Sequence, residues 1–162
     1  ERSTLVDIHA WCLMKNHFHL LLSEKIQGGI TKFLLKLNIG YANYFNTRHK
    51  RSGALFQGRT IKVHIETDPH FLHVLHYIHL NPLDYLPQAQ EWRSRKIRNA
   101  KQASTYLDQY RWSSYADYCG KKSFPSLLTT ELFREALGDI EKETFHYLHD
   151  IESDDLKSYT LE

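Results

Sequence analysis

The sequence predicts an α+β fold in which a β-hairpin is followed mainly by helices. Two apolar and aromatic segments, 6–13 and 17–22, have the usual length of strands. Two other segments, 29–48 and 69–81, repeat apolar residues at the spacing of amphipathic helices. The chain has 162 residues, which suits one domain, or a core domain with an appendage, and is enough to bury a hydrophobic core.

The predicted hairpin carries two histidines in its second strand. Lys15-Asn16 lies at or near the turn, because Asn is a common turn residue. Residues i and i+2 of a strand point to the same face, so His17 and His19 can bind one metal ion while Phe18 faces the other way. The alternative is that the two histidines bond to each other or to a backbone carbonyl. A hairpin alone is marginally stable, so more sheet is expected.

The helix expected at 29–48 follows two glycines, and we expect its apolar stripe to face the core. A basic loop comes next, with Arg48-His49-Lys50-Arg51 and then Phe56 and Arg59 between glycines. This pattern suits contact with a nucleic-acid backbone and an unstacked base, although a solvated helix end and turn would give the same pattern. Residues 60–65 alternate in the manner of a strand.

The helix expected at 69–81 has clear end signals. Thr67 or Asp68 can cap it, Pro69 suits the first helical position and Pro82 helps to end it. Residues placed at intervals of about 100° around the axis form an apolar face with a polar edge beside it. That edge presents His70, His73, Tyr77 and Asn81.

The same helix has a histidine at every third position from 70 to 79. Each step of three residues drifts by about 60° around the helix, so at most two neighbours can share a metal ion. We therefore expect these histidines to contact solvent or DNA rather than zinc. The four residues are His70, His73, His76 and His79.

The second half of the chain begins with a polar, basic stretch at 88–104, which predicts a basic helix or a flexible arm. In Trp112-Ser113-Ser114-Tyr115 we expect a serine to cap a helix, with the two aromatic residues in packing roles. Another helix is expected from Thr129 or Thr130 to near Gly138. A last short helix is expected within the acidic segment 139–162, up to Ile151.

Charge is unevenly distributed along the chain. Residues 1–88 hold ten basic against six acidic side chains, 89–122 eight against three, and 123–162 three against ten. A basic body with an acidic tail is compatible with a nucleic-acid face. No apolar run approaches the roughly 18 residues of a membrane helix and there is no signal-like leader, so a cytoplasmic protein is expected. Two distant cysteines indicate neither a disulfide framework nor a cysteine zinc site.

Four motifs in order resemble one family. His17-Phe18-His19 resembles the histidine-hydrophobic-histidine (HUH) motif of single-tyrosine transposases, and Tyr77-Ile78-His79-Leu80-Asn81-Pro82 resembles the helix with their catalytic tyrosine. Within this IS200-like superfamily, the short sequence segments around the motifs are most similar to those of the REP-associated tyrosine transposases. Those segments include Gly53-Ala54-Leu55-Phe56-Gln57-Gly58-Arg59 and Trp112-Ser113-Ser114-Tyr115. The family usually has proline where this chain has Lys15.

The resemblance, which runs from about residue 8 to 138, implies a ferredoxin-like antiparallel sheet with helices on one face. It implies a transposase domain at 1–88, a basic linker at 89–104 and a helical extension at 105–162. The family's domain begins with a strand and a helix before the hairpin, and we expect both to be missing here, either absent from the protein or not covered by this sequence. A monomer or a homodimer is expected, in which a partner chain can supply the strand by exchange.

The resemblance also implies an activity: metal-dependent cleavage and rejoining of single-stranded or hairpin-bearing DNA at repetitive elements, through a 5′-phosphotyrosine. Tyr77 would be the nucleophile, assisted by His73, and His17, His19 and Asn81 would hold Mg²⁺ or Mn²⁺. A bacterial, nucleoid-associated protein is implied. The predicted DNA-binding residues are Arg48, Lys50, Arg51, Arg59, Arg93, Arg95, Lys96 and Arg98.

Two other functions remain open at this point. The chain can be a domesticated transposase-like protein that binds DNA without cutting it, which would leave the histidine pair and Tyr77 without a chemical role. It can also be a metal-dependent nuclease that activates water, with Tyr77 only structural.

Overall fold

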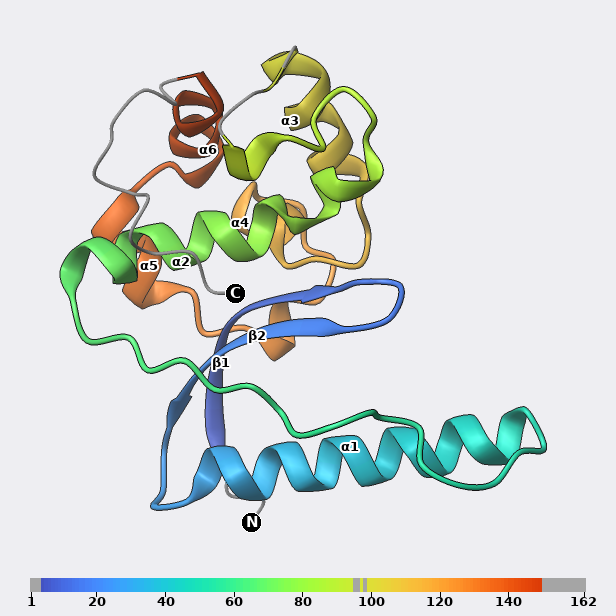
Figure 1. Cartoon of the computed structure of the whole chain (residues 1–162). Coiled ribbons are helices and arrows are strands. Elements are labelled where there is room, and N and C mark those ends of the chain that lie inside the picture. Colours follow the sequence, from blue (N-terminus) through green and yellow to red (C-terminus); the bar gives the residue numbers. More distant parts are fainter. Residues whose placement is uncertain (1–3, 95–96, 98, 150–162) are drawn as a thin grey trace. The chain divides into compact units, whose positions relative to one another are not determined.

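A computed structural model describes residues 4–94, 97 and 99–149 (Figure 1). Contacts divide the chain into two units: one comprises the residues up to Asp7 and Leu22–His64, the other Ile8–Leu21 and the residues from Ile65 onward. The predicted boundaries at 88 and 104 stay predictions. The strands are β1 (Val6–Leu13) and β2 (Phe18–Glu24), and the α-helices are α1 (Gly29–Arg48), α2 (Asp68–Leu80), α3 (Ala100–Gln109), α4 (Tyr115–Tyr118), α5 (Glu131–Leu137) and α6 (Ile140–His149).

The predicted hairpin is confirmed as a two-stranded antiparallel sheet of β1 and β2. Its turn is closed by the Met14 amide, which donates to the His17 carbonyl at 2.8 Å. The outer edge of β1 makes one further β-bridge, between Cys12 and Ser113. The motif around Ser113 therefore supports the hairpin across about a hundred residues of sequence. The fold is mixed α+β, as expected, and the ferredoxin-like arrangement stays a prediction.

The strand predicted at 60–65 is wrong, because these residues form no regular secondary structure. Ile61 is 87% exposed and Val63 49% exposed. Alternation produces a strand only where a neighbouring strand supplies hydrogen-bond partners, and among the described residues no strand pairs with this segment.

Helix α1 has the predicted bounds, but the expectation that its apolar stripe faces a core is wrong. Of its twenty residues only Gly29 and Leu34 are buried, whereas Tyr41 and Tyr44 are 49% and 61% exposed. Nothing in the described part of its own unit covers most of the stripe. The helix start requires glycine at position 29, because a Cβ there would lie 2.2 Å from the Leu5 carbonyl oxygen.

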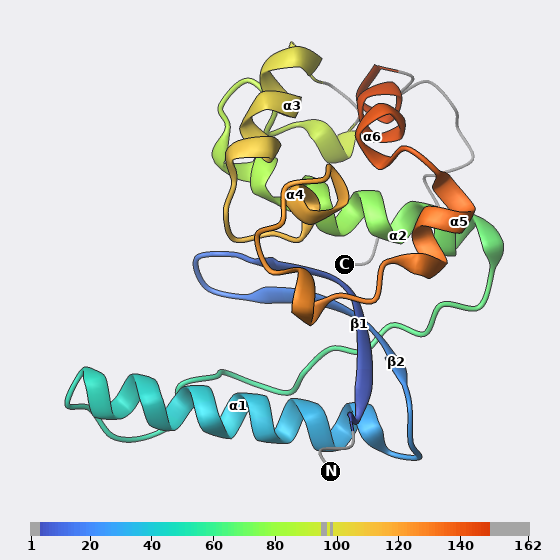
Figure 2. The same ribbon diagram turned by 180° about the vertical axis from the view of Figure 1, so that it is seen from behind.

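Helix α2 is the centre of the second unit. Its start is as predicted, with the Thr67 side chain accepting from the His70 amide and proline in the first turn, and it ends at Leu80, where a 3-10 helix (Asn81–Tyr85) begins. Figure 2 shows α3 and α6 side by side along α2, with α5 near its first turns. Eight of the thirteen residues of α2 are buried. The tertiary environment of α2 is therefore a packed core.

Two short 3-10 helices (Trp92–Ser94 and Pro125–Leu127) complete the secondary structure of the described residues. Trp92 is buried, and so is Ala103 of α3, so parts of the stretch predicted as a basic linker pack into the core. Helix α5 confirms the helix predicted after Thr130, and it ends at Gly138 with a positive φ of 67°. The predicted last helix is α6, and Ile151 lies outside the described residues.

The helix expected after Trp112 is only the single turn α4. Ser114 makes no side-chain cap, and it is the Ser113 hydroxyl that accepts from the Tyr115 amide at 3.2 Å. Tyr115 is buried, as expected, but the packing role for Trp112 is wrong, because its side chain is 52% exposed. No helix in the part of the chain that the structure describes is long and apolar enough to span a membrane.

Candidate active site

The histidine pair lies where β2 begins: His17 immediately precedes the strand, which starts one residue later than predicted, and His19 lies in it. The rings of His17 and His19 have centroids 5.0 Å apart and planes at 83°. His17 Nδ1 lies 2.8 Å from the side-chain oxygen of Asn16. That oxygen only accepts, so Nδ1 donates the hydrogen and Nε2 keeps its lone pair for a ligand. A carbonyl partner of this kind is the usual support of a metal-binding histidine.

His19 is the more buried of the pair. Its Nε2 atom is buried and has no hydrogen-bond partner among the described residues. Burial first, and then the neighbouring His17 and Arg93, lower the pKa of His19 to about 4. A neutral imidazole whose buried nitrogen has no partner among the described residues fits a metal ligand, although Nδ1 of the core residue His79 is also buried without a partner there.

Tyr77 lies next to the histidine pair although sixty residues separate them. It is on α2, and its ring centroid is 5.9 Å from that of His19, with the planes at 85°. The Tyr77 side chain is only 6% exposed. The structure therefore brings the two predicted parts of the site, the hairpin histidines and the α2 tyrosine, into contact within one unit. Their chemical roles stay predictions.

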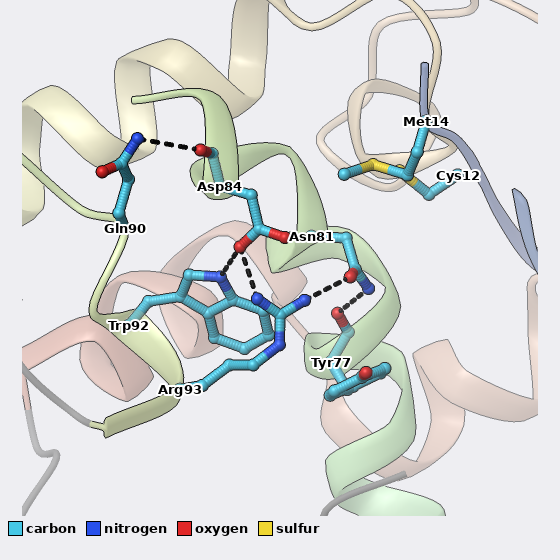
Figure 3. A network of polar contacts seen from close by, with 8 residues as sticks. All are labelled: Cys12, Met14, Tyr77, Asn81, Asp84, Gln90, Trp92 and Arg93. Atoms are coloured by element: carbon cyan, nitrogen blue, oxygen red, sulfur yellow. Dashed lines mark hydrogen bonds and ion pairs between the residues drawn. The ribbon is translucent and has the colours of Figure 1, made fainter. Parts of the chain in front are cut away.

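Asn81 is fully buried and links two other residues (Figure 3). Its Nδ2 donates to the Tyr77 carbonyl at 2.8 Å, and its Oδ1 accepts from Arg93 at 2.8 Å. The amide oxygen predicted to hold a metal thus has a guanidinium as partner in this structure. Within the described residues no third His, Cys, Asp or Glu joins the histidine pair. The ligand role of Asn81 stays a prediction.

Arg93 lies at the site, which sequence reasoning did not predict. Its guanidinium donates to Asp84 Oδ1 as well as to Asn81, and its central carbon is 4.4 Å from the Trp92 ring centroid and 5.8 Å from that of Tyr77. Burial lowers the pKa of Arg93, but Asp84 and then Tyr77 outweigh it and raise the pKa above its usual value. Arg93 therefore carries a permanent positive charge beside Tyr77.

The signal for Arg93 was only its membership of a basic stretch, and Asp84 was not singled out at all. Neither residue has a motif that marks it. Both reach the site because the short helices at 81–85 and 92–94 fold back beside the end of α2. No short-range pattern in the sequence predicts that the chain folds back at this point.

The histidine series on α2 does not face solvent, so the expected solvent or DNA contacts are wrong for most of it. His70, His76 and His79 are 9%, 6% and 0% exposed. His79 Nε2 lies 2.8 Å from the Ser114 hydroxyl, and His76 Nδ1 lies 3.3 Å from that of Thr144. Because these side chains are buried in an apolar environment, their polar atoms can form hydrogen bonds only with other groups in the core.

His73, the residue predicted to assist, is half-buried with its ring centroid 6.4 Å from that of Tyr77. Its Nδ1 lies 3.0 Å from the hydroxyl of Tyr147 on α6. His73 is therefore near the candidate nucleophile, and α6 also holds it.

The predicted DNA-binding residues are spread over both units. Arg48, Lys50, Arg51 and Arg59 are exposed at the end of α1 and in the loop after it. Arg51 lies 5.8 Å from the Phe45 ring centroid, and Arg48 lines a shallow surface hollow. Three further members, Arg95, Lys96 and Arg98, lie outside the described residues.

Comparison with known proteins agrees with the geometry. Residues 1–81 match the family model "Transposase IS200 like", which covers half of the chain and includes the hairpin histidines and α2 with Tyr77. No curated protein and no solved structure matches. The chain belongs to the IS200-like transposase family.

Proposed function

We propose that this protein cleaves and rejoins single-stranded, hairpin-bearing DNA at repetitive elements, with Tyr77 as the nucleophile. Membership of the family supports a transposase. The observation that carries the proposal is the contact of the His17 and His19 pair with the Tyr77 ring, 5.9 Å from His19. An assignment to the REP-associated transposases rests on the sequence segments around the motifs.

His17 and His19 are the residues that would hold a divalent cation, Mn²⁺ or Mg²⁺, with Asn81 as the proposed third ligand. Their fit rests on the buried Nε2 of His19, which has no hydrogen-bond partner in the described part of the chain, and on the orientation that Asn16 gives His17. When bound, such an ion draws negative charge away from a phosphate and leaves positions for phosphate oxygens.

Tyr77 would carry out the covalent step. Its side-chain oxygen loses a proton to solvent and forms a bond to phosphorus, while the bond from phosphorus to the 3′ oxygen breaks and that oxygen takes up a proton. The phosphodiester energy is kept in the 5′-phosphotyrosine, so the released 3′-OH can reverse the step without ATP. Because Tyr77 is only 6% exposed, an unpaired strand that can bend into the site suits it better than a rigid duplex.

The test uses a pool of single-stranded hairpins with randomised loops and flanks, incubated with the protein and Mn²⁺. A 3′ label is expected to move with the protein on a denaturing gel, because the 5′ phosphate of that fragment is joined to Tyr77. A 5′ label is expected in a free, shorter strand. Tyr77→Phe should abolish the adduct, and Tyr44→Phe, at an exposed tyrosine of α1, should leave it unchanged. No adduct from the wild type, or an adduct from Tyr77→Phe, would contradict the proposal.

A DNA-binding protein without cleavage is the second candidate. The engagement of the Asn81 oxygen by Arg93 favours it, since the guanidinium places a positive charge beside the oxygen that would bind a cation. Retention of labelled DNA with no cutting by the wild type would support this candidate. Cutting by Tyr77→Phe without an adduct would instead support a nuclease that activates water.

A further inference from the structure

We propose that Arg93 binds the scissile phosphate during attack by Tyr77, and that Asn81 and Asp84 are positioning residues that hold its guanidinium there. This inference rests on the proposed function and adds to it a charged group and the residues that aim it. The observations are the contacts of Arg93 with Asn81, Asp84, Trp92 and Tyr77 (Figure 3).

The guanidinium of Arg93 is held from several directions. One terminal nitrogen donates to Asp84 and the other to Asn81, and the group lies 4.4 Å from the Trp92 ring centroid. Asp84 is itself oriented, because its Oδ1 also accepts from Trp92 Nε1 at 2.8 Å. A long side chain on a surface normally keeps its rotamer freedom, and here that freedom is already restricted before any ligand arrives.

Asn81 connects the guanidinium to the backbone of the candidate nucleophile. The same amide accepts from Arg93 and donates to the carbonyl of Tyr77, both at 2.8 Å. Asn81 is 0% exposed, so solvent does not compete for either bond. The buried Asn81 side chain therefore sets the distance between the Arg93 guanidinium and the turn of α2 that carries Tyr77.

Arg93 remains within reach of a substrate. Its side chain is 27% exposed, and that of Asp84 is 31% exposed. A planar guanidinium suits the oxygens of a phosphate and does not lose its proton. As the Tyr77 oxygen bonds to phosphorus and the 3′ oxygen leaves, the non-bridging oxygens keep their negative charge, and a preorganised cation beside them lowers the barrier.

The purely structural explanation is that the ion pair only fastens the 81–94 segment to α2. The two explanations predict different losses. A fastening role would change the stability of the protein, whereas a phosphate-binding role would change the rate of adduct formation at saturating DNA. Partly exposed ion pairs contribute little to stability, so we expect the variants to fold.

The experiment measures single-turnover adduct formation by the full chain with Mn²⁺ and a hairpin that the wild type cleaves. Arg93→Gln is expected to lower the rate at least about 100-fold, with a smaller change in the dissociation constant for DNA. Arg93→Lys should recover little, because a point charge does not reproduce the planar fork. Arg111→Gln is the control, since Arg111 also lies over a tryptophan, 5.5 Å from the Trp112 centroid, but at an exposed position.

Chemical rescue separates a missing guanidinium from a disturbed fold. Methylguanidinium added to Arg93→Ala is expected to raise the rate of adduct formation at least about tenfold. A larger factor separates an enzyme with one well-placed charged donor from an enzyme without it, so partial rescue is enough to detect. Asp84→Asn, which keeps the Arg93 charge but weakens its anchor, should lower the rate with DNA binding unchanged. Melting temperatures accompany every variant, and rates are compared below them.

The outcomes are distinguishable. If the wild type forms no adduct, the proposed function fails. If the wild type forms it and Arg93→Gln forms it at the same rate, or methylguanidinium fails to rescue the folded Arg93→Ala variant, only this inference is overturned. Slow Arg93 variants that are rescued would support it.

Discussion

Helices α1 and α2 have similar periodic patterns and opposite surroundings. Two of the twenty residues of α1 are buried, against eight of the thirteen in α2. Both sequences predict a helix with one apolar face, yet only α2 lies among other helices of its unit. The pattern therefore sets the helical conformation, and the number of elements available to cover the face sets its burial.

The difference separates two kinds of surface in one chain. In α2 even polar groups are buried, and His76 and His79 each have one ring nitrogen near a hydroxyl, that of Thr144 or Ser114. That packing holds Tyr77 in place beside the histidine pair. In α1 the aromatic and basic side chains stay accessible, and the predicted DNA-binding residues Arg48, Lys50 and Arg51 lie at its end. We therefore expect the chemistry in the packed region and DNA contact at the exposed one.

The largest expected effect is on stability. Leu75→Ala on α2 removes a side chain that is 0% exposed, and should lower the free energy of unfolding by about 2–5 kcal/mol. Leu35→Ala on α1, where the side chain is 60% exposed, should change it by less than about 0.5 kcal/mol. Urea unfolding followed by circular dichroism measures both. Equal losses would mean that α1 is packed in solution.

The next effect is a pH dependence from His76. Burial, with a smaller effect of His73, lowers the pKa of His76 to about 4 from its usual 6.5. Between these values the unfolded chain binds a proton that the folded protein does not, so stability is complete above pH 6.5 and falls towards pH 4. The loss is about 3 kcal/mol at most, at about 1.4 kcal/mol per pKa unit.

His76→Asn is the matched variant for that measurement. It keeps a polar group for Thr144 but does not titrate, so the fall in stability between pH 6.5 and 4 should be smaller than in the wild type. His49→Asn, at the exposed end of α1, should leave the fall unchanged. An identical pH profile for wild type and His76→Asn would show that His76 is not buried as described.

A smaller effect tests the support of the histidine pair. Asn16→Ala removes the oxygen that lies 2.8 Å from His17 Nδ1, and should weaken Mn²⁺ binding about 10–100-fold. Titration calorimetry measures the affinity without DNA or turnover. Asn43→Ala, on exposed α1, is the control. Unchanged affinity in Asn16→Ala would argue that the metal is held elsewhere.

The smallest effect is expected at the exposed end of α1. Arg51→Gln should leave stability unchanged and lower affinity for single-stranded DNA, with the slope of log affinity against log salt reduced by about 0.7 for one lost phosphate contact. Lys36→Gln, earlier on α1, is the control. Fluorescence anisotropy at several salt concentrations gives the slope. A slope that is unchanged in Arg51→Gln but reduced in Lys36→Gln would place the DNA path elsewhere on the helix.

Much of the fold was predictable where the signal is local. The bounds of β1 and α1, the Thr67 start of α2 and the glycine end of α5 all follow from residues within a few positions of each other. The wrong predictions concern partners. Residues 60–65 alternate as a strand without a strand beside them, and the α2 histidines are polar but meet the core instead of solvent.

The sequence by itself determined that a histidine pair lies on a hairpin strand, that Tyr77 lies on a helix edge, and that basic residues follow α1. Only the tertiary structure decided that Tyr77 contacts His19, and that Arg93 and Asp84 join Asn81 beside it. The physical reason is the distance along the sequence over which each kind of interaction acts. Backbone periodicity and capping act within one or two turns, whereas these contacts join residues that come together only when the helices of the second unit pack around α2.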